Sequence, residues 1–137
     1  MNFDIEFPGG LQVAARLPGF LVTTDQSRAH GGGGTAPEPF DLFLAALGTC
    51  AGIYALRFCQ ERGIATEGLG LSLSTEPDPE RRRLQAIHLE LTFPAEFPER
   101  YRAAILRAVD QCAVKRHMIE PPRFTVTARA AALAGGA

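Results

Sequence analysis

The sequence lacks an excess of charge of either sign. Its 137 residues include 14 lysines and arginines against 15 aspartates and glutamates, a net charge of −1. Binding to nucleic acid or to an anionic membrane surface needs a clustered basic surface, so we expect neither partner. The sequence also lacks the run of ~18–20 continuous apolar residues that spans a membrane. Its most apolar stretch, residues 42–56, lies between Asp41 and Arg57 and is interrupted by Gly48 and Gly52.

Cysteine is scarce, and its spacing excludes several kinds of site. Three cysteines are an odd number, which argues against a disulfide framework. The N-terminus MNFDIEFPGG is acidic and has no apolar signal-peptide core, so we expect a cytoplasmic protein with reduced thiols. There is no Cys-x-x-Cys motif, and the cysteines and histidines lack metal-ligand spacing. We therefore expect no thioredoxin-type motif, no metal site and no cofactor.

Hydrophobic periodicity predicts one α+β domain over residues 1–137, with two long helices packed on antiparallel sheets. Apolar residues alternate in the predicted strands and recur at helical spacing in the two longer segments. The predicted order is βββ-α-ββ-α-β, with strands at 3–7, 11–17 and 20–25, a helix at 38–62, strands at 69–74 and 86–93, a helix at 98–117 and a strand at 123–129. The sequence also predicts a glycine-rich loop at 26–37, a polar hairpin loop at 76–83 and a frayed tail at 131–137.

The predicted helix at 38–62 is apolar on nearly every side. Glu38 and Asp41 suit the positive end of its dipole, and Pro39 suits its first turn. A helix that is apolar all round should be buried all round. A domain of this size cannot easily surround a helix of roughly six to seven turns, so we expect a second subunit to complete the cover.

Two of the cysteines lie on opposite faces of this helix. The nine positions from Cys50 to Cys59 correspond to ~13 Å along the axis, which excludes a bond between them. We interpret Cys59 as a core thiol, because free cysteine is among the most buried residue types. Cys50 shares its face with Phe43, Leu47 and Tyr54. Taken alone, this helix favours a small core residue at Cys50 over a reactive thiol.

Cys112 makes a reactive role for Cys50 possible. It lies on the inward stripe of the second predicted helix, so both helices present a cysteine toward the core. One thiol could then be oxidised while the other resolves it. A Cys/His hydrolase remains an alternative, with His30 or His117 as the histidines that could reach a helix cysteine.

Two segments resemble the cysteine motifs of a known family. Residues 37–50, P-x-P-x-D-L-F-L-A-A-L-G-T-C, and residues 111–118, Q-C-A-V-K-R-H-M, are similar to the two motifs of the OsmC/Ohr family, with the general OsmC-like branch as the nearer match. The predicted order of elements agrees with that family, so the resemblance covers nearly the whole chain. A proline commonly follows the second cysteine in the family, and this chain has Ala113 there.

The resemblance implies an intertwined homodimer with the long helices at its centre, and thiol peroxidase chemistry at the dimer interface. Cys50 would attack the O–O bond of a hydroperoxide and become a sulfenic acid. Cys112 would condense with it to a disulfide, and an external dithiol, of lipoyl type in some members, would reduce that disulfide.

The resemblance also implies an arginine that keeps the attacking thiol ionised. In the peroxidase members it comes from the N-terminal strands and is held by a glutamate at the start of the long helix. The glutamate position falls here on Phe40 and the arginine position near Gln12. The candidates for these two roles in this chain are Glu38, Asp41, Arg16 and the loop residue Arg28.

Two hypotheses of different classes follow. The first is a thiol-dependent reductase of hydroperoxides, with organic hydroperoxides preferred over hydrogen peroxide because the pocket is apolar. The second is a non-catalytic OsmC-like domain that binds a small apolar ligand at the dimer interface. A guanidinium near the Cys50 sulfur would favour the first hypothesis.

Overall fold

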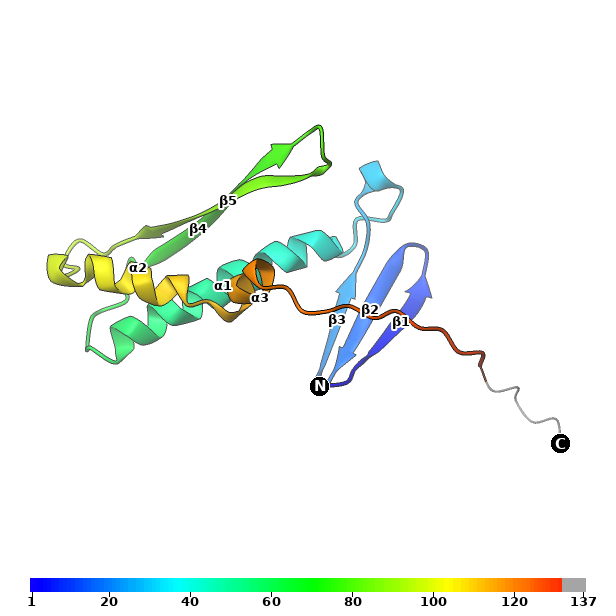
Figure 1. The fold of residues 1–137 in the computed structure, drawn as a ribbon, viewed down its shortest axis with the longest axis horizontal. Helices are drawn as coiled ribbons and strands as arrows, with labels where there is room; N and C mark the ends of the chain where they lie inside the picture. Colours follow the sequence, from blue (N-terminus) through cyan, green and yellow to red (C-terminus); the bar gives the residue numbers. More distant parts are fainter. Residues whose placement is uncertain (132–137) are drawn as a thin grey trace.

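The computed structural model describes residues 1–131, and the remaining residues of the predicted tail lie outside that range. Figure 1 shows a mixed α+β chain with antiparallel strands, as predicted. The elements in chain order are β1 Asp4–Gly9, β2 Gln12–Leu17, β3 Phe20–Thr24, the short 3-10 helix η1 Arg28–His30, α1 Pro39–Gln60, β4 Gly70–Asp78, β5 Arg83–Thr92, the 3-10 helix η2 Glu99–Tyr101, α2 Arg102–Asp110 and α3 Ala113–Ile119.

The N-terminal meander forms a separate three-stranded sheet in the order β1-β2-β3. Its register places Ile5, Ala15 and Val22 opposite one another, so they share one face. Phe7 belongs to the same alternating set on β1, yet 81% of its surface is exposed. The sheet lies away from α1 in Figure 1, and its apolar face is therefore largely uncovered within one chain.

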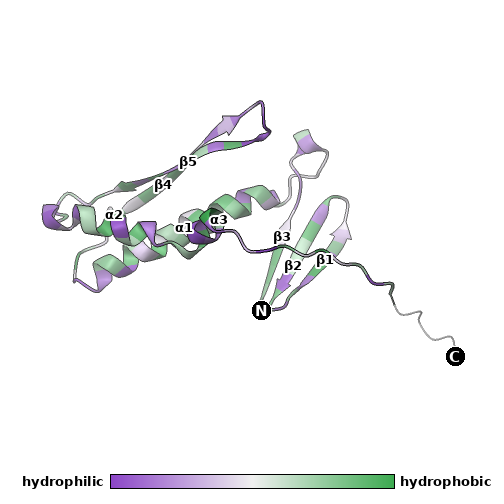
Figure 2. Ribbon diagram, in the orientation of Figure 1, coloured by the Kyte–Doolittle hydropathy of each residue, from purple (hydrophilic) through white to green (hydrophobic). Residues whose placement is uncertain are grey.

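The long helix α1 runs from Pro39 to Gln60, within the predicted range of 38–62. The backbone N–H of Glu38 donates to the Asp41 carboxylate at 3.1 Å, which satisfies one free donor at the start of the helix. Length and composition alone would let α1 cross a membrane, a property that core helices of soluble proteins share. Only 28% of its most apolar stretch is buried within the described part of the chain, so much of α1 lacks cover. Figure 2 shows the hydrophobic residues along this helix in green.

The hairpin β4-β5 packs on the glycine face of α1. A Cβ atom at Gly48 would lie 3.8 Å from Leu73, and one at Gly52 would lie 3.9 Å from Leu71. The two glycines thus allow strand β4 to approach the helix closely. The polar loop predicted at 76–83 is wrong in length, because the strands continue to Asp78 and resume at Arg83. The ladder is irregular between Glu76 and Pro77, where a bulge admits the proline, but pairing continues to Asp78 and Arg83.

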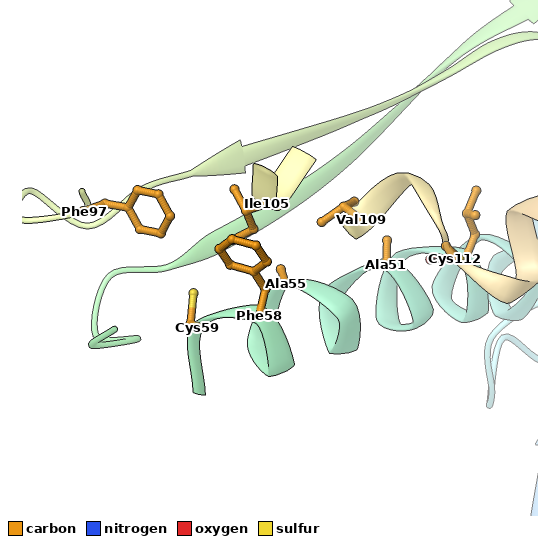
Figure 3. Close-up of a cluster of buried hydrophobic side chains, with 9 residues drawn as sticks. Ala51, Ala55, Phe58, Cys59, Phe97, Ile105, Val109 and Cys112 are labelled. Atoms are coloured by element: carbon orange, nitrogen blue, oxygen red, sulfur yellow. Dashed lines mark hydrogen bonds between the residues drawn. The ribbon is translucent and has the colours of Figure 1, made fainter. Parts of the chain in front are cut away.

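The second long helix predicted at 98–117 is wrong as a single element. The chain turns through η2, runs as α2 to Asp110, and restarts as α3 at Ala113. Cys112 has φ −48° and ψ 123°, an extended conformation that interrupts the helix. The predicted inward stripe still holds in part, because Ile105, Val109 and Cys112 are buried (Figure 3).

The predicted strand at 123–129 is not formed in this chain. Within the described range, residues 121–131 contain no helix or strand and are fully exposed, with Phe124 at 82% and Val126 at 96%. Figure 1 shows this segment running away from α3 as an isolated chain. A strand needs a neighbouring strand to pair with, and no segment within residues 1–131 provides one here.

The core lies where α1, α2 and the β4-β5 hairpin meet (Figure 3). Its buried members are all apolar. They come from α1, from α2 and from the segments on either side of α2: Leu47, Ala51, Ala55, Phe58, Cys59, Phe97, Ile105, Val109 and Cys112. Because α2 and α3 both lie along α1, the interruption between them determines what faces the middle of the long helix.

Candidate functional site

Cys50 lies in the middle of α1, half-buried, against the edge of the core cluster that contains Cys112. The second cysteine reaches it from the interruption between α2 and α3. The Cys112 side chain is completely buried, and its thiol donates to the backbone carbonyl of Leu47 at 3.9 Å. Leu47 is three residues before Cys50, about one helical turn. The structure thus brings together the two cysteines that the sequence predicted to face each other.

The interruption at Cys112 also directs backbone donors toward Cys50. As the residue preceding α3, Cys112 leaves the first N–H groups of that helix without intrahelical partners. The backbone N–H groups of Val114 and Ala113 help to lower the pKa of the Cys50 thiol. In the single continuous helix that the sequence predicted, these N–H groups would instead have donated to carbonyls of the preceding helical turn.

The surroundings lower the pKa of Cys50 below the ordinary value of a thiol. Burial alone would raise it, but this is outweighed by the nearby Val114 N–H, Cys112 side chain and Ala113 N–H, and by the positive charge of Arg116. Donors that point at sulfur stabilise the thiolate over the thiol. Cys50 is therefore the more easily ionised thiol of the pair.

The pKa of Cys112 moves in the opposite direction. Burial is the main reason for its rise, and the neighbouring Cys50 adds to it, against smaller contributions from the N–H groups of Lys115 and Val114. The surroundings of Cys112 therefore favour its thiol form, whereas those of Cys50 favour the thiolate. The two sulfurs form an unlike pair, one suited to attack and the other suited to remain a thiol until a later step.

Cys59 stands outside this pair. It is fully buried beside Phe58, toward the opposite end of the cluster from Cys112 (Figure 3). Burial raises the pKa of its thiol, and the charge of Arg62 opposes this only in part. These properties agree with the core thiol that the sequence predicted.

Arg16, predicted as a candidate, lies on the N-terminal sheet and pairs with Glu6 of the neighbouring strand. A second bond joins the Arg16 Nη2 atom to the Glu6 Oε2 atom at 3.0 Å. This pairing is the main reason why the pKa of Glu6 is lowered. The structure does not bring Arg16 to Cys50 within one chain, and Arg28 lies in η1.

Glu38 and Asp41, the predicted acidic candidates, lie together at the start of α1. The Glu38 carboxylate accepts the Ser27 N–H at 2.9 Å and contacts the His30 Nδ1 atom at 2.7 Å. The hydroxyl and N–H of Ser27, with smaller help from His30, lower the pKa of Glu38 to about 2. Among residues 1–131, neither acid forms an ion pair with an arginine. They join the glycine-rich loop to the helix.

Neither histidine of the hydrolase alternative hydrogen-bonds to Cys50 in the described part of the chain. His30 contacts Glu38, and the His117 Nδ1 atom lies 2.7 Å from the Ala113 carbonyl. A general base must lie within hydrogen-bond reach of the group it deprotonates. The geometry therefore gives no support to a Cys/His hydrolase.

A network in the glycine-rich loop was missed by the sequence analysis. The buried Asp25 carboxylate accepts the Thr35 hydroxyl at 2.7 Å and the Thr35 N–H at 3.0 Å. These bonds to Thr35 are the main reason why the pKa of Asp25 is lowered. Gln12 donates to the same hydroxyl at 2.8 Å. A Cβ atom at Gly32 would lie 2.1 Å from the Gln26 carbonyl, so this loop is tightly bent.

A large cavity opens beside the cysteine pair. It occupies about 1610 Å³ between the hairpin and the helices, with walls that include Phe43, Leu47, Ile87, Leu89, Leu106 and Val109. Ordinary ligand pockets enclose ~300–1,000 Å³. Cys50 does not line the cavity, but Leu47, one turn earlier, does.

Comparison with known proteins relates the chain to one family. A family model described as OsmC-like protein matches residues 31–127. No curated protein matches the chain. Among solved structures, an osmotic-stress-induced and detoxification-response protein from Psychrobacter arcticus is 20% identical with a TM-score of 0.71, over 85% of this chain and 86% of the other. An organic hydroperoxide resistance protein OsmC from Legionella pneumophila is 17% identical with a TM-score of 0.55, over 86% and 89%.

Proposed function

Because this chain belongs to the OsmC-like family, we propose that it is a thiol-dependent reductase of hydroperoxides in which Cys50 attacks and Cys112 resolves. The observation that carries the proposal is the buried Cys112 thiol placed on the Leu47 carbonyl, one helical turn before Cys50, and the directions of the two pKa values, down at Cys50 and up at Cys112, agree with it. A peroxidatic cysteine must be a thiolate at neutral pH, whereas a resolving cysteine is needed only after the first step. The structural neighbour from Legionella, an organic hydroperoxide resistance protein, is consistent with this chemistry.

The reaction balances with the two cysteines and an external dithiol. The Cys50 thiolate attacks the terminal oxygen of the hydroperoxide, so that an S–O bond forms and the O–O bond breaks. The alkoxide takes up a proton and leaves as an alcohol, while Cys50 becomes a sulfenic acid. The Cys112 sulfur then attacks the Cys50 sulfur, and water leaves as the disulfide forms. A dithiol, of lipoyl type in some family members, reduces the disulfide by exchange.

The apolar surroundings favour organic hydroperoxides over hydrogen peroxide. The cavity beside the pair is walled mainly by aliphatic and aromatic side chains. Burial of an organic substituent against such walls contributes ~25 cal/mol per Å² of apolar surface, which hydrogen peroxide cannot gain.

The functional unit in this proposal is an intertwined cytoplasmic homodimer. Three apolar surfaces lack cover within one chain: the face of the N-terminal sheet with Phe7, much of α1, and the segment with Phe124 and Val126. Soluble monomers rarely expose apolar patches of this combined extent. A second copy could cover all three, with its C-terminal segment as an added strand.

Stopped-flow oxidation by cumene hydroperoxide tests the activity. Cys50 should react much faster than a free thiol of similar basicity, and hydrogen peroxide should react more slowly than the organic peroxide. Cys50→Ser should abolish turnover, whereas Cys112→Ser should permit one stoichiometric oxidation and then stop. A Cys50 that reacts no faster than a free thiol with either peroxide would refute the enzyme.

The second candidate function is a non-catalytic domain that binds a small apolar ligand at the dimer interface. The specific observation in its favour is the large apolar cavity, together with Gln12 at the position where the family resemblance places an arginine. Saturable binding of a fluorescent fatty acid without any peroxide turnover would favour this function over the first.

A further inference from the structure

The break between α2 and α3 has no signal in the local sequence. Residues 99–120 contain neither proline nor glycine, and neither Gln111 nor Cys112 is a strong helix breaker. The N–H groups of these two residues donate to the carbonyls of Ala108 and Val109, three residues back, each at 3.1 Å. The last turn of α2 is thus tightened before the chain leaves the helix. Because local propensity alone would also permit one continuous helix, contacts that exist only in the broken form decide between the two.

An ion pair bridges this break. The Lys115 ammonium, in the first turn of α3, bonds to the carboxylate of Asp110, the last residue of α2. In one continuous helix the two residues would be five positions apart, about 140° around the axis, and would lie on different faces. The ion pair therefore depends on the break that it spans.

Each charge of this pair lies at the unfavourable end of its own helix. A carboxylate at the C-terminus of α2 faces the negative end of that helix dipole, and an ammonium in the first turn of α3 faces the positive end. Among residues 1–131, Asp110 and Lys115 form ion pairs only with each other. Their positions are thus explained by the bond across the break and not by stabilisation of either helix.

The broken form sets the position of the Cys112 thiol. Cys112 lies at the break with φ −48° and ψ 123°, and its side chain is completely buried. In this conformation its thiol contacts the Leu47 carbonyl at 3.9 Å, one helical turn before Cys50. Side-chain direction follows the backbone conformation of a residue, so a change at the break would move the sulfur relative to α1.

We propose that Asp110 and Lys115 are positioning residues for the disulfide between Cys50 and Cys112, because their ion pair favours the broken form that holds the Cys112 sulfur beside α1. The inference rests on the proposed function only for the use made of this disulfide. The Lys115 and Asp110 side chains are 36% and 64% exposed. Exposed ion pairs contribute little to global stability, so loss of this pair should leave the fold intact while it shifts the balance between the broken and continuous forms.

The test is the equilibrium between the Cys50–Cys112 disulfide of the full-length protein and a glutathione redox buffer. Oxidised glutathione takes two electrons from the protein thiols and leaves as two reduced molecules, so the ratio of the two protein forms gives the effective concentration of one thiol at the other. Acid quenching, alkylation and peptide mapping measure that ratio. Asp110→Asn and Lys115→Gln should each lower the effective concentration about two- to fivefold, since only the fraction of chains in the broken form can close the bond.

A double variant and a charge exchange isolate the contribution of the pair. Asp110→Asn combined with Lys115→Gln should lower the effective concentration no further than either single change, because both remove the same interaction. The charge exchange, Asp110→Lys with Lys115→Asp, should restore it, since it rebuilds the pair and places each charge at the favourable end of its helix.

Glu99→Gln is the matched control, because it removes another exposed ion pair that does not span the break. Glu99 pairs with Arg102 at 2.9 Å, at the start of α2. This control should leave the effective concentration unchanged. An unchanged value in Asp110→Asn, an equal loss in Glu99→Gln, or a charge exchange that restores nothing would each overturn the proposal.

Two further outcomes separate this inference from the proposed function. A wild-type protein that forms no Cys50–Cys112 disulfide in the glutathione buffer would overturn both. Because the measurement needs no peroxide, the expected changes in a protein without peroxide turnover would refute the proposed function and leave the positioning role of Asp110 and Lys115 intact.

Discussion

Apolar side chains are buried in the central part of this chain and exposed in its two terminal segments. Around α2 and the middle of α1, residues such as Ile105 and Ala51 are completely buried within one chain. On the N-terminal sheet and the C-terminal segment, equally apolar residues such as Phe7 and Val126 face water. The first region holds the cysteine pair, and the second holds apolar surfaces that are exposed in the described part of the chain and that the proposed partner would cover. The cysteine pair and the apolar surfaces of the proposed interface therefore come from different parts of the sequence.

The largest effect is expected where burial is complete within one chain. Ile105→Ala should lower the free energy of unfolding by about 2–5 kcal/mol, because it leaves a cavity in the core. The conservative Ile105→Val should cost about 0.5–1.5 kcal/mol. Urea unfolding monitored by circular dichroism measures both changes. Equal, small effects would mean that this core is not the rigid part of the molecule.

The next effect concerns the uncovered region. Phe124→Asp combined with Val126→Asp should weaken dimerisation by about 100-fold or more, since both charges would enter the proposed interface. Both residues are exposed in a single chain. If the protein were a monomer, the two substitutions would therefore change neither its sedimentation nor its fold. Sedimentation velocity across a dilution series distinguishes the two outcomes.

Thr125→Asp is the control for that experiment, because alternation in a strand places Thr125 on the opposite face. It should leave the dimer nearly unchanged. A wild-type protein that sediments as a folded monomer at micromolar concentration would contradict the proposed dimer, because the terminal segments would then need no second copy to cover them.

The smallest effect concerns the connection between the N-terminal sheet and α1, where Glu38 bonds to Ser27 and His30 of the glycine-rich loop. The pKa of Glu38 is about 2 in the folded chain against 4.5 for an unperturbed glutamate, so its ionised form stabilises the fold above pH ~4.5. That contribution should disappear as the pH falls through about 2. Glu38→Gln should thus have a lower Tm than the wild type at pH 7, and the two values should converge in acid. A Tm difference that does not change with pH would show that the carboxylate charge is unimportant there.

The sequence predicted the elements whose signals are local. Alternation and Pro-Gly turns located the meander, and Pro39 with Asp41 located the start of α1. The interruption at Cys112 had no such signal, because neither Gln111 nor Cys112 is a strong helix breaker. The strand expected at 123–129 alternates correctly, but a strand also needs a partner that periodicity cannot identify.

The candidate site divides in the same way. Helical spacing predicted that Cys50 and Cys112 both lie toward the core, and the resemblance to the OsmC/Ohr motifs supplied their expected roles. The donors of Ala113 and Val114 could not be predicted, since they become free only where the helix breaks. Arg116 could have been noticed four residues after Cys112, but only after that segment was known to be a helix of its own. Asp25 was missed because its partners come from a loop without periodicity.

The central claim is that Cys50 and Cys112 form a working pair from which Cys59 is separate. One equivalent of cumene hydroperoxide added to the fully reduced protein, followed by rapid alkylation and peptide mapping, tests this directly. The account predicts a Cys50–Cys112 disulfide and a free, alkylatable Cys59 after unfolding. Three unmodified thiols, or a disulfide that includes Cys59, would contradict it.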